Sequence, residues 1–243
     1  TDDEELAAGT DPNNADTDGD GLNDGFEVGS DDPDMPENLA LRAAPRLYVS
    51  QLAGSASGPG LSWSTAYSEL RDALADAASR ELTTEKADDV REVWVAEGSY
   101  LPTDGVARTA SFLLVQRLAV YGGFSGDETK LAQRNADPRT NGTVLSGDLV
   151  GNDDPEDPGT LDDNSYHVVI AGPTAVIADP QVLDETTILD GFAITSGMAD
   201  GLPPAIGGTI FHNRGGGIYV NNSSPALTNL LVRNNSAIDW GGG

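Results

Sequence analysis

Short runs of β-branched and aromatic residues recur from Glu92 onward, separated by Gly, Asn and Asp residues that favour turns. Runs of this kind predict β-strands. No long helical stretch interrupts them after residue 80, although Asp127–Asn135 predicts one short helical turn within an insertion. The expected strands, including one before Glu92, are Leu47–Ser50, Val93–Val95, Ser111–Val115, Leu118–Tyr121, Thr143–Leu145, His167–Ile170, Thr186–Leu189, Phe192–Ile194, Ile218–Val220 and Leu227–Val232.

The last part of the chain repeats itself. Gly215–Gly217 returns as Gly241–Gly243, an offset of 26 residues, and Ile188–Phe192 aligns with Leu227–Leu231. A period in the twenties built from short strands is typical of a solenoid, in which each coil buries its apolar face against its neighbours. The Asp and Asn residues at the bends tolerate the left-handed conformation and can bond to neighbouring coils. The pattern predicts an all-β chain folded as a right-handed parallel β-helix.

One helix is expected before this region, over residues 63–80, because five apolar residues there share one helical face. These residues are Trp63, Tyr67, Leu70, Leu74 and Ala77. A single helix at the start of a solenoid can cover the open end of the core. We therefore expect an N-terminal capping helix whose aromatic residues pack rather than bind a ligand.

Residues 1–38 differ from the rest of the chain in charge. They hold 14 of the 40 acidic residues and no Lys, Arg or His. Because this block has too few apolar residues to bury a core, its ordering requires metal binding. We therefore divide the chain into an acidic module at 1–38, a junction at 39–46 and a β-helix at 47–243, which we expect to continue in the natural protein.

The whole chain carries a formal net charge of -27 and no cysteine. The charge argues against nucleic acid and anionic membrane surfaces as partners, because few bases are present to neutralise phosphates. The lack of cysteine excludes disulfides and zinc–thiolate sites. No run of 18 apolar residues is present, so we expect no membrane insertion.

The chemistry of the acidic module lies in residues 16–27, which read D-x-D-x-D-G-x-x-D-x-x-E. Carboxylates at relative positions 1, 3 and 5, a carbonyl at 7, a carboxylate at 9 and a bidentate Glu at 12 are the ligands of a calcium loop. Hard oxygen ligands without His or Cys indicate Ca²⁺. The expected ligands are Asp16, Asp18, Asp20, the carbonyl of Leu22, Asp24 and Glu27.

The flanks of this loop are rich in Gly and Pro, which makes an EF-hand with its two helices improbable. Gly9–Pro12 and Gly29–Pro33 frame the loop with the same G-[TS]-D-(D)-P pattern, so Thr1–Pro12 is expected to be the end of a preceding copy. The module resembles thrombospondin type 3 repeats and similar Asp-rich repeats of bacterial surface proteins. The resemblance implies an extended string wrapped around calcium ions, and it adds Asp11 and Asp31 as ligands. Because the pattern is already under way at Thr1, we expect the chain to be a piece of a longer protein.

A second resemblance covers residues 47–243. Segments of this region resemble the β-helix of large bacterial surface proteins of the polymorphic outer-membrane protein and pectin-lyase-like types. The segments are 60–67, 93–100, 121–129, 145–149, 164–169, 189–197, 215–219 and 234–237. The resemblance implies adhesion, surface coating or a passenger role, without choosing among them.

Catalysis is the competing function class, since parallel β-helices include pectate lyases and polygalacturonases. A lyase needs a basic residue beside calcium, and an inverting hydrolase needs two carboxyl groups roughly 6.5–9.5 Å apart. The two lysines, Lys86 and Lys130, fall in expected loops. No nucleophile elbow, Walker loop or dinucleotide fingerprint is present. We therefore expect no enzymatic activity.

Three further features invite a functional interpretation. The acidic loop at 153–163 is expected to be a solvated insertion, with a second cation site or a catalytic cluster as the alternatives. His167 falls in an expected strand and is predicted to be packed, whereas His212 is predicted to be a surface residue of a loop. Of the tryptophans, Trp63 and Trp94 suit core positions.

These observations favour an extracellular structural or adhesive protein of the bacterial cell surface, in which Ca²⁺ rigidifies an acidic linker to a β-helix stalk. Self-association, contact with neighbouring domains of the same protein and binding of a cell-surface glycan are the partners that this hypothesis admits. Two alternatives stay open. One is a carbohydrate-active β-helix enzyme, and the other is a non-catalytic carbohydrate-binding module with at least two exposed aromatic residues in line.

Overall fold

The computed structural model describes residues 46–52, 60–79, 90–154, 156–173, 182–202 and 210–241. The predicted module at 1–38 and all of the junction except Arg46 lie outside the described residues.

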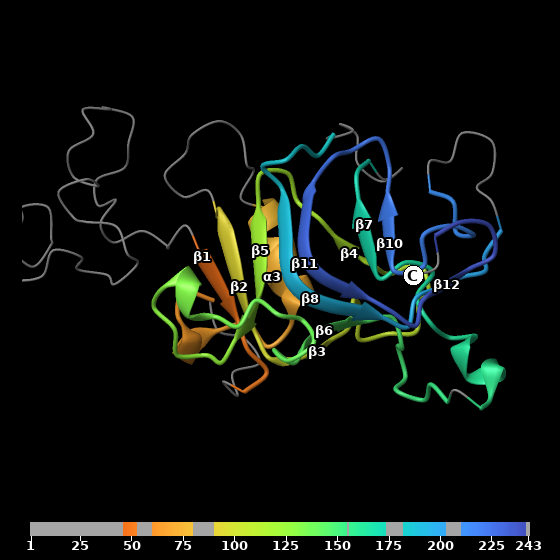
Figure 1. Cartoon of the computed structure of the whole chain (residues 1–243), viewed down its shortest axis with the longest axis horizontal. Coiled ribbons are helices and arrows are strands. Elements are labelled where there is room, and N and C mark those ends of the chain that lie inside the picture. Colours follow the sequence, from red (N-terminus) through yellow and green to blue (C-terminus); the bar gives the residue numbers. More distant parts are fainter. Residues whose placement is uncertain are drawn as a thin grey trace, which may run out of the picture.

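Parallel β-strands are the main regular structure of the described chain (Figure 1). Every expected strand is present, and Thr186–Leu189 and Phe192–Ile194 form parts of one longer strand. The short strands β3, β9 and β12 were not anticipated from the sequence. The strands are β1 (Arg46–Val49), β2 (Glu92–Ala96), β3 (Gly98–Tyr100), β4 (Phe112–Leu113), β5 (Ala119–Phe124), β6 (Thr143–Ser146), β7 (Val169–Ala171), β8 (Ile188–Thr195), β9 (Met198–Ala199), β10 (Ile218–Val220), β11 (Ala226–Val232) and β12 (Ser236–Ala237).

Three parallel sheets contain these strands. The largest has seven strands in the order β1-β2-β5-β8-β6-β3, with β11 also paired to β8, and it curls into a half-barrel (Figure 1). The smaller sheets have the orders β10-β7-β4 and β12-β9. The chain visits the large sheet, crosses to a small one and returns, which is the alternation that a solenoid requires.

The register of the large sheet stacks apolar side chains in columns. Leu47 pairs with Val93, Val93 with Val120, Val120 with Leu189, and Leu189 with Leu227. The first four side chains of this column are almost completely buried. Such β-branched and leucine side chains pack well on a pleated surface, which explains why the runs in the sequence form strands.

Strand β8 bends at Gly191, where φ is +89°. Its first part pairs with β5 and its second part with β6, so β8 belongs to two faces of the curl. A Cβ atom at Gly191 would lie 2.5 Å from a guanidinium nitrogen of Arg134 and 2.8 Å from the Gly122 carbonyl oxygen. Both the backbone conformation and the close approach therefore require glycine at this bend.

The helix is shorter than the sequence predicted. Helix α3 spans Leu70–Ser79, and Trp63–Thr65 forms a separate 3₁₀ turn, η2. The prediction of one helix from 63 to 80 was wrong because Tyr67 is extended: its N–H donates to Tyr48 and its carbonyl accepts from Ser50, each at 2.8 Å. Within the part of the chain that the structure describes, no helix has the length and apolar character needed to cross a bilayer.

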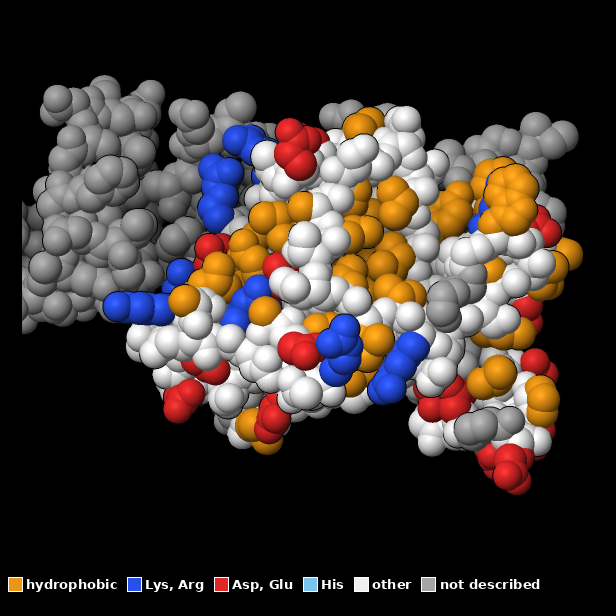
Figure 2. All heavy atoms as spheres, in the orientation of Figure 1, with side chains coloured by type: hydrophobic (Ala, Val, Ile, Leu, Met, Phe, Trp, Pro, Cys, Tyr) orange, Lys and Arg blue, Asp and Glu red, His pale blue; other side chains and the backbone are white. Residues whose placement is uncertain are grey.

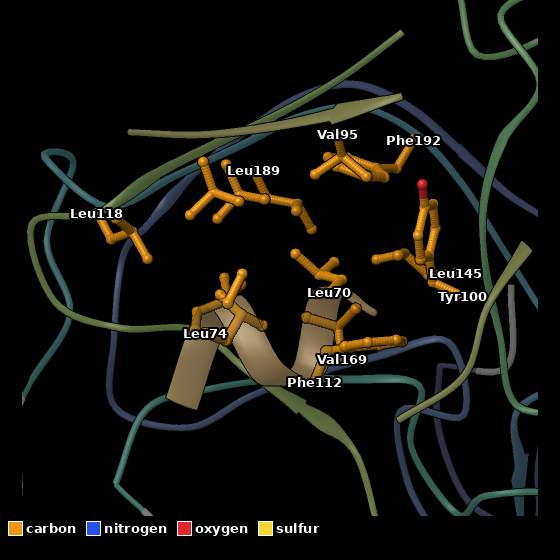
Figure 3. Close-up of a cluster of buried hydrophobic side chains, with 14 of the residues drawn as sticks. Leu70, Leu74, Val95, Tyr100, Phe112, Leu118, Leu145, Val169, Leu189 and Phe192 are labelled. Carbon is orange, nitrogen blue, oxygen red and sulfur yellow. The ribbon is translucent and has the colours of Figure 1, made fainter. Parts of the chain in front are cut away.

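Helix α3 contacts β1, β2 and β4, at the β1 edge of the large sheet. Its buried residues are Leu70, Ala73, Leu74 and Ala77. Figure 3 shows Leu70 and Leu74 pointing into the same cluster as Val95 and Leu189 of the large sheet and Phe112 of β4. The helix thus packs on the main core cluster, and its role as a cap stays a prediction.

Two further 3₁₀ turns lie in insertions between strands. The turn η3, Leu131–Gln133, falls within the predicted helical turn at 127–135. The turn η4, Pro158–Leu161, lies in the acidic loop.

Candidate functional site

The predicted calcium ligands lie outside the described residues. They are Asp11, Asp16, Asp18, Asp20, Leu22, Asp24, Glu27 and Asp31. Within the described ranges, no group of three or more His, Cys, Asp or Glu side chains is arranged to hold a metal ion. The donor set itself, carboxylates at fixed spacing and one main-chain carbonyl, suits Ca²⁺.

The acidic loop projects from the body near residue 160 (Figures 1 and 2). Its tip is exposed, as predicted for a solvated insertion, and Asp154, Glu156, Asp157 and Asp162 all reach solvent. At the start of η4, the Asp157 carboxylate accepts from the Gly159 N–H at 3.0 Å. The outer acids therefore hold the turn together or face water, whereas Asp153 and Asp163 are only partly exposed.

The two histidines form a pair. His167 is 1% exposed, which confirms its predicted packing, and its Nδ1 lies 3.0 Å from the Gly215 carbonyl oxygen. A carbonyl only accepts, so Nδ1 of His167 carries the proton and Nε2 is free to accept from Nδ1 of His212 at 3.3 Å. The prediction of a surface role for His212 was wrong, because its ring is half-buried and packs against Tyr166 and His167.

Burial lowers the pKa of His167 from 6.5 to about 4. The unfolded chain therefore binds a proton at His167 below pH 6.5, whereas the folded chain does so only near pH 4. Between these two values, the free energy of unfolding decreases as the pH is lowered. Between pH 7 and pH 5 we expect the native protein to lose about 2 kcal/mol more stability than a His167→Gln variant. Urea unfolding at both pH values measures this difference, and equal losses in the two proteins would contradict it.

Asp190 and Arg134 form the most buried salt bridge in the described part of the chain. Arg134 donates to Oδ1 of Asp190 at 2.7 Å, and the two side chains are 8% and 13% exposed. Thr228 donates to Oδ2 at 2.7 Å, and the Asn229 amide lies 3.0 Å from Oδ1. Burial alone would raise the pKa of Asp190, but the bonds from Arg134, Asn229 and Thr228 outweigh it and lower the pKa.

This cluster joins three adjacent strands, because Arg134 also donates to the Gly122 carbonyl of β5 at 2.8 Å. The expected bonding of bend residues between coils is confirmed at Asp190 and Asn229, and Asn229 has the left-handed φ of +46°. The role of Arg134 was missed, since nothing in its local sequence marks it as a partner for a residue 56 positions away.

The aromatic residues offer no line of exposed rings in the described ranges. Trp94 is 1% exposed, as predicted, and stacks on Phe124 with ring centroids 4.5 Å apart. Trp63 is half-buried and donates from its indole N–H to the Glu128 carbonyl at 2.9 Å. Trp240, at 72% exposed, is the one described aromatic side chain that mainly faces solvent.

Three hollows on the surface have volumes of 250, 280 and 360 Å³. The 280 Å³ hollow contains Asp137 and Arg139, and it is the one of the three with an acidic residue in its lining. None of these three hollows brings two carboxylates together, which is the arrangement that a glycoside hydrolase requires.

Comparison with known protein families gives a match in the N-terminal segment. Residues 1–15 and 16–28 match the model of the bacterial TSP3 repeat. Two adjacent segments within residues 1–28 are thus similar to this repeat. The second match contains all six residues of the predicted loop, and the first contains Asp11, so the match supports two copies of a repeat within residues 1–28. Asp31 and the frame at Gly29–Pro33 lie outside both matches. No curated protein and no solved structure is significantly similar to the chain.

Proposed function

We propose that this chain belongs to an extracellular structural protein of a bacterial surface, in which Ca²⁺ stiffens residues 1–38 into a linker that leads to a β-helix stalk. The observation that carries the proposal is the match of residues 1–28 to the bacterial TSP3 repeat, together with the calcium-ligand spacing inside the second copy. Outside cells calcium is abundant, so even a weak site of this kind is filled.

The parallel sheets support a complete right-handed β-helix for residues 47–243. Successive passes of the chain through the large sheet pair in parallel, and the apolar column from Leu47 to Leu227 runs through five strands. A solenoid of this kind is suited to act as a stalk, because each added coil packs only on its neighbour and lengthens the molecule.

The edge of the large sheet supports self-association or contact with a neighbouring segment. Among the described strands, β11 pairs only with β8, and Leu227, Leu230 and Val232 are half-buried. Figure 2 shows apolar side chains gathered over this part of the face. An unpaired strand edge next to apolar surface is a template for a further strand.

A non-catalytic role is part of the proposal. The carboxylates of Asp157 and Asp190 are held by a turn and by an ion pair, and none of the three hollows brings two carboxylates together. For glycan binding, the observation available is Trp240, which stands over Arg214 with the guanidinium carbon 4.6 Å from a Trp240 ring centroid. One exposed ring supports an adhesive contact less well than the calcium repeats support a linker.

The linker role is tested by distance measurement across the repeats. The chain has no cysteine, so Ala7→Cys and Val28→Cys, which spare the predicted ligands, place two spin labels at known positions. Fully extended, the 21 intervening steps span at most about 75 Å. We expect a broad distance distribution in EDTA and a narrow one in millimolar Ca²⁺, measured by double electron–electron resonance.

The matched control is the same labelled pair in an Asp18→Asn, Glu27→Gln background, where calcium should leave the distribution broad. A distribution that is equally broad with and without calcium in the unmodified ligand background would show that calcium does not stiffen the linker.

A further inference from the structure

Four side-chain oxygens are buried without a hydrogen-bond partner at the root of the acidic loop. They are Oδ1 of Asp153, Oδ1 of Asp163, Oδ1 of Asn164 and Oγ of Ser165. Asn164 is 1% exposed, so its amide oxygen has lost its water as well. A buried polar atom without a partner costs about 1–3 kcal/mol, and a charged one costs more.

Two side-chain hydrogen bonds link residues 152 and 153 on one side of the loop root to residues 163 and 164 on the other. The Asn164 amide nitrogen donates to Oδ2 of Asp153 at 3.3 Å, which places the amide beside that carboxylate. The Asn152 amide nitrogen donates to Oδ2 of Asp163 at 3.1 Å. Each carboxylate thus uses one oxygen within the loop and leaves the other, Oδ1, unpaired.

The root of the loop is fixed by independent contacts. The Asp148 carboxylate accepts from the N–H groups of Gly151 and Asp153, at 2.7 and 3.3 Å. On the returning side, the Asn164 carbonyl accepts from Nε of Arg108 at 2.6 Å, and the Ser165 N–H donates to Gly147 at 2.9 Å. The unpaired oxygens therefore lie on a braced segment and not at the exposed tip.

In the described ranges, no positive side chain is paired with either carboxylate. Among the described residues, no ion pair involves Asp153 or Asp163, and the nearby Arg108 is engaged with Asp200 and with main-chain carbonyls. Two acids alone fall short of a cluster of three acidic or histidine ligands. Calcium, however, also accepts amide and main-chain carbonyl oxygens and completes six to eight ligands with water.

We propose that Asp153, Asp163 and Asn164 form a second cation site, for Ca²⁺, at the root of the acidic loop. The ligands are hard oxygens, with no His or Cys among them, which disfavours zinc. Calcium is preferred over Mg²⁺ because its coordination by six to eight oxygens is flexible and admits carboxylates, amide oxygens and water, whereas Mg²⁺ demands near-ideal octahedral geometry. The site uses none of the residues of the TSP3 repeats and stands independently of them.

The test is a calorimetric titration of CaCl₂ into the EDTA-stripped full chain and into an Asp153→Asn, Asp163→Asn variant. These changes keep the shape of both side chains and remove their charge. We expect the variant to lose one equivalent of calcium, or to bind it at least about 10-fold more weakly, while the equivalents due to residues 1–38 remain. The control is Glu156→Gln, Asp162→Asn, which removes the same charge from exposed positions of the loop.

A second arm separates this site from the repeats. In an Asp18→Asn, Glu27→Gln background the calcium taken up at the loop should persist, and adding the Asp153 and Asp163 changes should abolish it. Calcium uptake that the loop variant does not alter, or that the exposed-charge control lowers equally, overturns the proposal. If the repeats do not bind calcium, the native chain and the Asp18, Glu27 variant will instead give the same titration curve.

Discussion

Replacing Asp190 by alanine should lower the free energy of unfolding by about 3–5 kcal/mol, the usual cost of breaking a buried ion pair from one side. The change leaves the Arg134 guanidinium, 8% exposed, without its carboxylate. It also removes the acceptor of Thr228 and Asn229 on the neighbouring strand. Urea unfolding at pH 7 measures the loss, which should come with looser packing of β11 on β8.

The control for this prediction is Arg139→Ala in the same insertion. Arg139 contacts Asp137 at 3.7 Å and is 76% exposed, and exposed pairs of this kind contribute about 0–1 kcal/mol. In addition, the double variant Arg134→Ala, Asp190→Ala should cost less than the sum of the two single changes, because the residues interact directly. Strictly additive losses would mean that the pair does not hold the three strands together.

The location of the strands could be predicted from the sequence because many of their side chains are buried between equivalent side chains of two neighbouring strands. Val93, Val120 and Leu189 each stack between equivalent residues on the neighbouring strands, so the β-branched and leucine pattern repeats in each pass of the chain. The strands β3, β9 and β12 have two or three residues each, too few to show a period.

The errors have a common physical cause, which is pairing between residues far apart in the chain. Tyr67 has helical spacing in the sequence, but hydrogen bonds to Tyr48 and Ser50 hold it extended. His212 lies in a turn, as its sequence suggests, but its ring is half-buried because it packs against His167, 45 positions away. Local propensity gives no signal of such contacts.

The candidate sites divide in the same way. Six of the predicted calcium ligands lie within twelve consecutive residues, so their spacing alone predicts them, and the family match supports the type of repeat. At the root of the acidic loop, the carboxylate of Asp153 meets Asn164 from the opposite end of the loop. The sequence shows the acids there but not which of them turn inward.

Loss of two repeat ligands should have the largest effect on calcium binding. Asp18 and Glu27 supply relative positions 3 and 12 of the loop, and the second of these is the bidentate ligand of the pattern. Changing both to their amides removes two charges from the ion's ligands while preserving side-chain size. We expect the affinity of this loop to fall at least about 100-fold, more than the 10–100-fold loss typical of changes beyond the ligands themselves.

The matched control is Asp34→Asn, Glu37→Gln. These residues belong to the same acidic block but lie outside the segments that match the TSP3 repeat and outside the predicted ligand set. Because the control removes the same total charge, any general attraction of calcium to an acidic chain should be weakened equally in both variants.

Calorimetric titration of CaCl₂ into the EDTA-stripped full chain, the Asp18, Glu27 variant and this control tests the central claim most directly. We predict saturable uptake at or below millimolar calcium by the native chain and the control, and loss of the repeat's share of that uptake in the Asp18, Glu27 variant. No uptake at millimolar calcium by the native chain, or the same titration curve for all three proteins, would contradict a calcium-stiffened linker.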